Sequence, residues 1–168
     1  MNRHDILSVS VITALGLALL PGNAVAQSAK DLVGNWTAVS NVTIRQDGTK
    51  ADPFGGPNVK STYMFATDGH FAIINANVDT PKFASNARAQ GTAEENKAAV
   101  LGSLALFGTY SMDTAGKSLT LKVEGSSYPN WTGTDQKRTI VSFTGDELKW
   151  TLTPSIGQTG EVTLKRVK

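Results

Sequence analysis

Few side chains in this sequence could perform covalent or acid–base chemistry. The 168 residues contain no Cys and two His, of which His4 lies in the N-terminal segment and His70 follows the turn Asp68-Gly69. A thiol nucleophile and a pair of His ligands for zinc are therefore excluded, and a Ser-His-Asp triad would have to recruit His70. The chain also lacks a Gly-rich phosphate loop between a strand and a helix. We expect no cofactor and no metal, and we interpret His70 as a surface residue, with a pH-sensitive or ligand-facing role as the alternative.

Glu124 and Arg138 are the remaining candidates for acid–base chemistry or charge recognition. On the strand expected at 118–125, Glu124 alternates with apolar residues and therefore lies on the opposite face of the sheet. If the apolar face points inward, Glu124 is solvated. If the other face points inward, apolar walls would raise the pKa of Glu124 and make it a general acid or base. Arg138 could bind a carboxylate or a polarised oxygen of a ligand, or it could pair with Glu124 across adjacent strands.

A second set of side chains is suited to binding. Small-molecule sites combine apolar walls with a few polar groups that orient the ligand. The expected walls are Tyr63, Phe65, Phe71, Ile73, Tyr110 and Trp131, and the expected orienting groups are Arg88, Gln136 and Arg138. If the site is catalytic, Tyr110 is the candidate proton donor beside Glu124 and Arg138.

Short strands separated by turns must position these residues. Turn signals such as Gln46-Asp47-Gly48 and Asp113 to Gly116 recur between runs rich in Thr, Val and aromatic residues. The expected strands lie near 35–46, 60–66, 70–77, 107–112, 118–125, 136–143, 147–153 and 160–167. Eight strands joined mostly by tight turns predict an all-β, antiparallel, up-and-down barrel, because closure removes exposed sheet edges.

Two segments interrupt the strand pattern. Residues 47–59 form a Gly/Pro-rich loop, and its apolar residue Phe54 is expected to fold over another part of the molecule. Thr92 and Glu95 form a capping box that predicts one short helix, which we expect to lie across a barrel end. The preceding stretch, 81–88, is a candidate lid.

The N-terminal residues have the composition of a secretory signal. Arg3 and His4 precede an uncharged apolar run over 6–20, and small residues end at Ala26, after which we expect cleavage. The run is shorter than the roughly 20 residues that span a bilayer, so we expect no stable membrane insertion after cleavage. The remaining 27–168 would be one domain that is periplasmic or secreted. A formal net charge of +2 is too small to favour nucleic acid as a partner.

The start of this domain resembles the Gly-x-Trp entry into the first strand of lipocalins, here Gly34-Asn35-Trp36. Further motifs are Tyr63-Met64-Phe65, Asp68-Gly69, Gly91-Thr92, Glu94-Glu95-Asn96, Phe107-Gly108-Thr109-Tyr110, Val123-Glu124-Gly125-Ser126, Tyr128-Pro129-Asn130-Trp131, Gly133-Thr134 and Gln136-x-Arg138. Together they are similar to bacterial lipocalin-like domain proteins over about 32–165. The resemblance implies a small calycin-type barrel with a closed base and a mouth. It also implies that Arg166 or Lys165 packs across Trp36.

These observations favour a protein that binds a small, largely hydrophobic molecule in its barrel. One alternative is an enzyme that isomerises, cyclises or hydrates a small apolar substrate, as the similar allene oxide cyclase barrels do. A second alternative is a barrel with a packed interior, whose surface binds a partner in the cell envelope. The sequence leaves open which strand face lines the barrel, and with it the choice among these functions.

Overall fold

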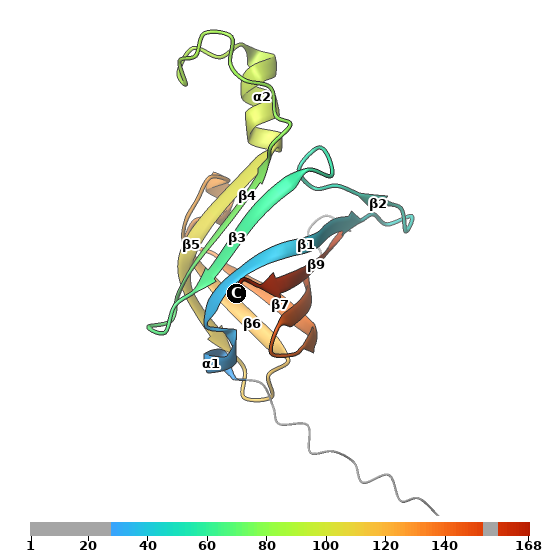
Figure 1. The fold of residues 1–168 in the computed structure, drawn as a ribbon, viewed down its shortest axis with the longest axis vertical. Coiled ribbons are helices and arrows are strands. Elements are labelled where there is room, and N and C mark those ends of the chain that lie inside the picture. The colour runs from blue at the N-terminus through green and yellow to red at the C-terminus, as the bar shows by residue number, and fades with distance from the viewer. Residues whose placement is uncertain (1–27, 153–157) are drawn as a thin grey trace, which may run out of the picture.

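The computed structural model describes residues 28–152 and 158–168, which form a closed antiparallel β-barrel (Figure 1). Its strands are β1 (Gly34–Ile44), β3 (Val59–Phe65), β4 (His70–Asn77), β5 (Ser103–Met112), β6 (Ser118–Ser126), β7 (Asp135–Phe143), β8 (Glu147–Leu152) and β9 (Thr159–Arg166). Each pairs with the next, and β9 pairs with β1 to close the barrel. The predicted eight-stranded up-and-down barrel is therefore confirmed. The expected signal segment, 1–26, lies outside the described residues.

The structure adds one strand and lengthens another. β2 (Lys50–Ala51) pairs with the end of β1 and extends the sheet beyond the barrel. β5 begins at Ser103, whereas a start near 107 was expected from the sequence. The reason is local, because Gly102 ends the preceding helix as its C-cap and the chain enters the strand directly afterwards.

One end of the barrel is closed by Trp36 and Arg166. Trp36 is fully buried and donates its indole N–H to the carbonyl oxygen of Leu32, at 2.9 Å. The Arg166 guanidinium carbon lies 4.1 Å from the centroid of the Trp36 ring. Its nitrogens donate to the carbonyl oxygens of Asp31, Val33 and Gly145 at 2.6–2.8 Å. Of the two cations expected over Trp36, Arg166 is therefore the one that packs there, and it ties the strand ends to the short helix α1 (Ala29–Leu32).

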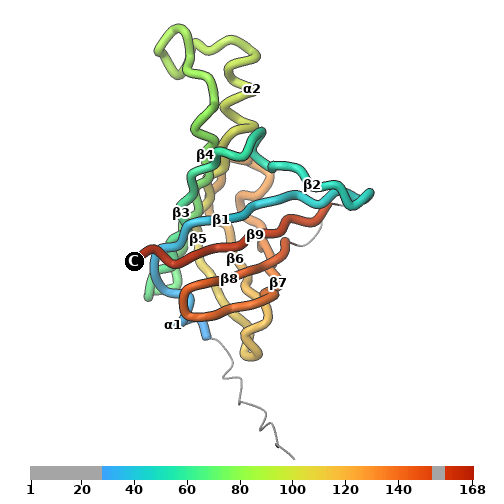
Figure 2. The backbone as a smooth tube through the Cα atoms, turned by 45° about the vertical axis from the view of Figure 1, so that its right-hand side comes forward, coloured from blue at the N-terminus to red at the C-terminus, as the bar shows by residue number. Residues whose placement is uncertain are grey.

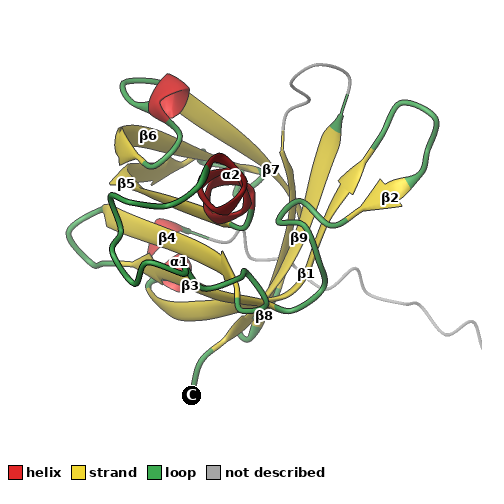
Figure 3. Cartoon of the chain, turned by 90° about the horizontal axis from the view of Figure 1, so that it is seen from above, coloured by secondary structure: helices red, strands yellow, loops and turns green. Residues whose placement is uncertain are grey.

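The two ends of the barrel differ in their connections. At the base, short turns over 66–69, 113–117 and 144–146 join the strands. At the other end the longer connections over 45–58, 78–102 and 127–134 gather (Figure 2). Figure 3 looks onto this end from above. Because the base is closed by packed side chains, the end with the long connections is the mouth.

The predicted capping box is present at α2 (Ala93–Leu101). The amide of Glu95 donates to the Thr92 hydroxyl oxygen at 3.2 Å, and the amide of Thr92 donates to the Glu95 carboxylate at 2.8 Å. The expectation that this helix lies across a barrel end was wrong. None of its residues is buried, and it projects away from the rim (Figure 1). Its sequence explains this, since Glu94 and Lys97 leave it without a broad apolar face to pack on the barrel.

Candidate functional site

The mouth half of the barrel contains a cavity of about 260 Å³. Seven of the barrel strands contribute to it, namely all except β6, together with the loops that carry Phe54 and Trp131. Its lining residues are Asn41, Thr43, Pro53, Phe54, Tyr63, Ile73, Asn75, Leu104, Leu106, Trp131, Arg138, Trp150, Leu152, Gly160 and Val162. This set is mostly apolar, with Arg138 as its single charged member.

Four of the predicted binding residues meet in this cavity. They are Tyr63 of β3, Ile73 of β4, Trp131 of a short 3₁₀ turn, and Arg138 of β7. They come from distant parts of the chain and are brought together by barrel closure. The Trp131 ring is held at the mouth by Tyr128, whose ring centroid lies 5.8 Å away.

Phe65, Phe71 and Tyr110 point inward or partly inward, but they lie toward the base and do not line the cavity. Phe65 and Phe71 flank the base turn and are buried in the packed core. The Tyr110 ring packs on Phe65 at a centroid distance of 5.1 Å, and its hydroxyl donates to the Ala66 carbonyl oxygen at 2.8 Å. The expectation that these three rings are cavity walls is corrected accordingly, because the cavity occupies only the mouth half.

The remaining predicted polar residues also lie outside the cavity. Glu124 is exposed on the outer face of β6, since the apolar residues Leu121 and Val123 take the inward positions. Arg88 is exposed in the connection before α2. The Gln136 amide is half-buried and donates to the Thr134 hydroxyl oxygen at 2.9 Å. Glu124 therefore faces solvent, and neither acid–base chemistry in the cavity nor an ion pair with Arg138 is open to it.

Arg138 is a buried cation in an apolar enclosure. The residue is 5 % exposed and sits between Leu119 of β6 and Leu152 of β8 in the barrel register. Its guanidinium donates from Nη1 to the Lys137 carbonyl oxygen at 3.1 Å. Burial lowers the pKa of Arg138 to about 10, opposed by its interaction with Tyr63. At neutral pH the side chain is therefore still protonated.

Tyr63 and Asn75 form a polar pair beside this cation. Both are at least 97 % buried, and the Tyr63 hydroxyl donates to the Asn75 amide oxygen at 3.1 Å. Burial raises the pKa of Tyr63 to about 12, against the opposing effects of Asn75 and Arg138. The phenol is thus neutral over the physiological range and acts as a hydrogen-bonding group, not as an acid.

Trp150 completes the polar part of the wall. It is 1 % exposed, and its indole Nε1 has no hydrogen-bond partner within the described part of the chain. Trp150 and Asn75 were not predicted as site residues from the sequence. Both lie at inward positions of their strands, in the same alternation as Leu148 and Ile73. The sequence signal that could have identified them is a polar or aromatic residue at an inward position, close to the end of a strand at the mouth.

Phe54 covers part of the cavity from the mouth. It is 7 % exposed, and the Asn77 side-chain amide donates to its carbonyl oxygen at 3.0 Å. The Gly/Pro-rich loop therefore folds its single aromatic ring into the barrel opening, as its composition indicated. By contrast, residues 81–88 do not line the cavity; the Ala84 amide binds Glu95 of the projecting α2 at 2.8 Å.

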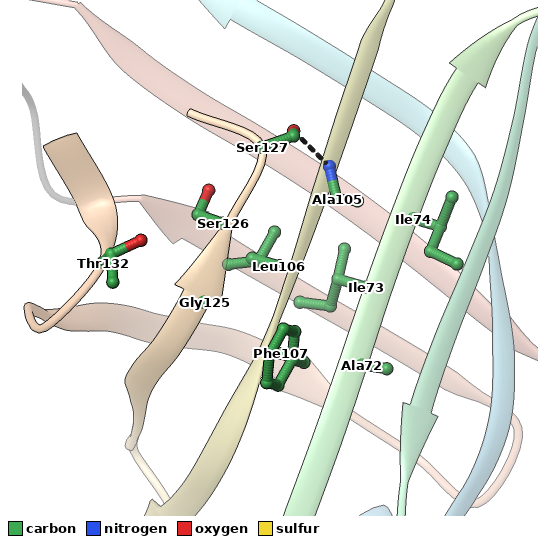
Figure 4. A pocket seen from close by; sticks show the side chains of 10 residues that line it. All are labelled: Ala72, Ile73, Ile74, Ala105, Leu106, Phe107, Gly125, Ser126, Ser127 and Thr132. Atoms are coloured by element: carbon green, nitrogen blue, oxygen red, sulfur yellow. Dashed lines mark hydrogen bonds between the residues drawn. The ribbon is translucent and has the colours of Figure 1, made fainter. Parts of the chain in front are cut away.

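A second hollow lies on the outer face of β4, β5 and β6 (Figure 4). Ile74 and Phe107 are exposed there, and the Ala105 amide donates to the Ser127 hydroxyl oxygen at 2.9 Å. The Phe107 ring lies close against Gly125, where a Cβ would approach it to 2.5 Å. This hollow is more open to solvent than the cavity, and Ile73 and Leu106 border both of them.

The described residues offer little other chemistry. His70 lies at the base turn, where its Nδ1 is 3.1 Å from the Asp68 carboxylate and its side chain is 59 % exposed. Across 28–152 and 158–168, no group of three His, Asp or Glu side chains is placed to hold a metal ion. Nor does that part of the chain include a helix long and apolar enough to cross a membrane.

Comparison with known families finds a match to the lipocalin-like domain over residues 33–164. No curated protein matches the chain. Among solved structures, a redesigned β-barrel is similar with a TM-score of 0.44 at 13 % identity, covering 84 % of this chain and 96 % of that chain. Bovine odorant-binding protein in complex with a selenium-containing odorant gives a TM-score of 0.42 at 12 % identity, covering 84 % and 74 %. A fatty acid transporter gives 0.38 at 15 % identity, covering 83 % and 98 %.

Proposed function

Because the chain belongs to the lipocalin-like domain family, we propose that its barrel binds a small, largely hydrophobic molecule. The observation that supports this most strongly is the cavity of about 260 Å³ in the mouth half of the barrel. Its aliphatic and aromatic walls surround only a few polar groups, which is the composition of small-molecule sites. A well-packed domain of this size does not keep an apolar space without a reason, since each lining atom there forgoes dispersion contacts.

The ligand would enter past Phe54. This ring covers part of the cavity from a loop, not from a strand, and a loop can move without breaking barrel hydrogen bonds. Trp131 lies at the same end on its own short connection. Entry therefore needs rearrangement of connections at the mouth, while the base around Trp36 and Arg166 stays intact.

Binding is tested with a neutral fluorescent probe, N-phenylnaphthylamine, added to the purified barrel. We expect saturable binding with enhanced probe fluorescence, and stabilisation by about 3 kcal/mol when free probe is near 100 times its Kd. Leu104→Trp should reduce the affinity at least about tenfold, because a larger ring at this half-buried position fills the cavity.

The matched control is Ala105→Trp, on the next residue of β5. Ala105 is exposed on the outer face, so the same ring added there leaves the cavity unchanged. Absence of saturable binding by the wild-type protein would overturn the proposed function. Loss of binding in Ala105→Trp but not in Leu104→Trp would place the probe on the outer hollow instead of in the cavity, because Ala105 lines that hollow and Leu104 does not.

The two other functions that the sequence left open have less support. Enzymatic turnover would need a proton-transfer group, and Glu124 lies outside the barrel. A packed barrel would have no interior space, whereas the mouth half holds a cavity.

Export is a further part of the proposal. The polar start, the apolar run over 6–20 and the small residues ending at Ala26 support secretion to a periplasm or to the medium. We expect the intact mass of the protein recovered from its source cells to correspond to 27–168. A mass that retains Met1 or begins far from Gln27 would contradict cleavage after Ala26.

A further inference from the structure

We infer that the ligand of this cavity is an amphiphilic carboxylate, held by Arg138 with the indole N–H of Trp150 as a second donor. This inference rests on the proposed function and adds the chemical class of the ligand and the residues that recognise its polar end. The apolar part of the ligand would fill the space toward Leu104, Leu106 and the mouth.

The first observation is the missing counter-charge of Arg138. Its only hydrogen bond goes to a backbone carbonyl, and no carboxylate of the described residues lies within 4.0 Å of its guanidinium. No Asp or Glu of 28–152 or 158–168 lines the cavity. A buried charge is normally paired, because removing it from water is strongly unfavourable. We therefore infer that the anion that compensates Arg138 comes from a ligand, since the described residues supply none.

The second observation is that the polar wall offers donors. The Trp150 indole N–H has no partner among the residues that the structure describes. The Asn75 amide oxygen already accepts from Tyr63, which leaves the amide N–H groups of Asn75 for another acceptor. Arg138 likewise keeps N–H groups beyond the one directed at Lys137. A ligand with two acceptor oxygens and no donor of its own complements this arrangement.

The third observation is the net charge of the side chains that line the cavity. Arg138 is the only charged residue among those lining the cavity, so a single negative charge is balanced and a dianion such as a phosphate monoester is not. A neutral alcohol or ester would leave the guanidinium unpaired. A carboxylate matches both the charge and the planar fork of the arginine.

The test compares matched ligands that differ only in the polar end: decanoate, decanol and methyl decanoate, each displacing N-phenylnaphthylamine from the wild-type protein at neutral pH. We expect decanoate to bind roughly 10- to 100-fold more tightly than either neutral ligand, as charge-assisted hydrogen bonds in an enclosed site imply. Arg138→Met should remove this preference and leave the affinity for decanol within about threefold. Trp150→Phe, which keeps the ring and deletes the N–H, should weaken decanoate binding several-fold without affecting decanol.

Lys137→Met is the control for charge alone. Lys137 precedes Arg138 on the same strand but is exposed on the outer face, so its loss should not change the preference. Equal binding of decanoate and decanol by the wild-type protein would overturn the inference while leaving the proposed function intact. Failure of all three ligands together with the neutral probe would overturn both. The comparison on the wild-type protein needs no variant, so it decides the question even if Arg138→Met does not fold.

Discussion

Replacing Gly108 by Ala lowers the free energy of unfolding by about 3–5 kcal/mol, the range reached when backbone packing at a special position is broken. Gly108 lies opposite a β-bulge, because the register of β5 against β6 shifts between Phe107 and Gly108 and leaves Glu124 of β6 as the extra residue. A Cβ at this position would overlap the carbonyl oxygen of Lys122 and lie 2.9 Å from the amide nitrogen of Glu124. Both are backbone atoms of β6, so no side-chain rotation relieves the overlap. The measurement is urea unfolding followed by circular dichroism.

Gly145→Ala is the control for this experiment. Gly145 lies in a base turn, where nothing is within 4 Å of an added Cβ, and we expect a change within about 0.5 kcal/mol. Similar stabilities for Gly108→Ala and wild type would mean that β5 and β6 can separate at the bulge. The close contact would then not constrain the barrel.

Alternation along the strands predicted which way most side chains face, but not how deep they lie. Phe65, Phe71 and Tyr63 were all assigned to the interior on this basis, and all three are buried. Only Tyr63 reaches the cavity, because Phe65 and Phe71 adjoin the base turn at 66–69. The position of an inward side chain between base and mouth depends on which end of the barrel is closed. Contacts between segments far apart in the chain, such as Arg166 over Trp36, determine which end that is.

The role of Arg138 also needed the closed barrel. From the sequence, pairing with Glu124 was a reasonable alternative, since the two residues lie on strands that neighbour each other. The structure separates them by face: Arg138 points in and Glu124 points out. Trp150 was not predicted as a site residue because an inward Trp is ordinarily part of the packed core. Its unsatisfied indole N–H becomes evident only when the neighbouring strands β7 and β9 are in place.

The connections were the least predictable part. The capping box of Thr92 and Glu95 is a local feature, and it predicted where α2 begins. Where the helix lies depends on tertiary contacts, and the exposed side chains of Val100 and Leu101 show that few are made. Phe54, unlike α2, is packed against the barrel as its sequence suggested. Burial of a large ring in the apolar mouth is favourable, and a Gly/Pro-rich loop allows the ring to reach it.

Replacing Arg138 by Met raises the free energy of unfolding of the ligand-free protein by about 1–4 kcal/mol, because a buried cation without a partner is exchanged for an apolar side chain of similar length. The pKa of Arg138 gives a consistent magnitude. Burial lowers it from the ordinary value of an arginine to about 10, and at about 1.36 kcal/mol for each pKa unit a shift of this size destabilises the folded state by about 3 kcal/mol. Urea unfolding at pH 7 of the two delipidated proteins measures the difference.

The pH dependence of this difference identifies its cause. A cation whose pKa is lower in the folded state destabilises the protein while it is protonated in both states. The wild-type free energy of unfolding therefore rises as the pH increases through about 10 toward the higher pKa of the unfolded state. The variant lacks this contribution. Tyr63, whose pKa Arg138 helps to lower, has a pKa of about 12 in the wild-type barrel and therefore stays neutral in both folded proteins up to pH 10.5. The stability gap between Arg138→Met and wild type should therefore narrow from pH 7 to pH 10.5. A gap that is constant over this range would show that better packing by Met, and not the removal of charge, stabilises the variant. With decanoate present the order should invert, since the ligand stabilises only the protein that retains the cation. A barrel that becomes more stable when it loses its binding residue has kept Arg138 for its ligand rather than for its fold.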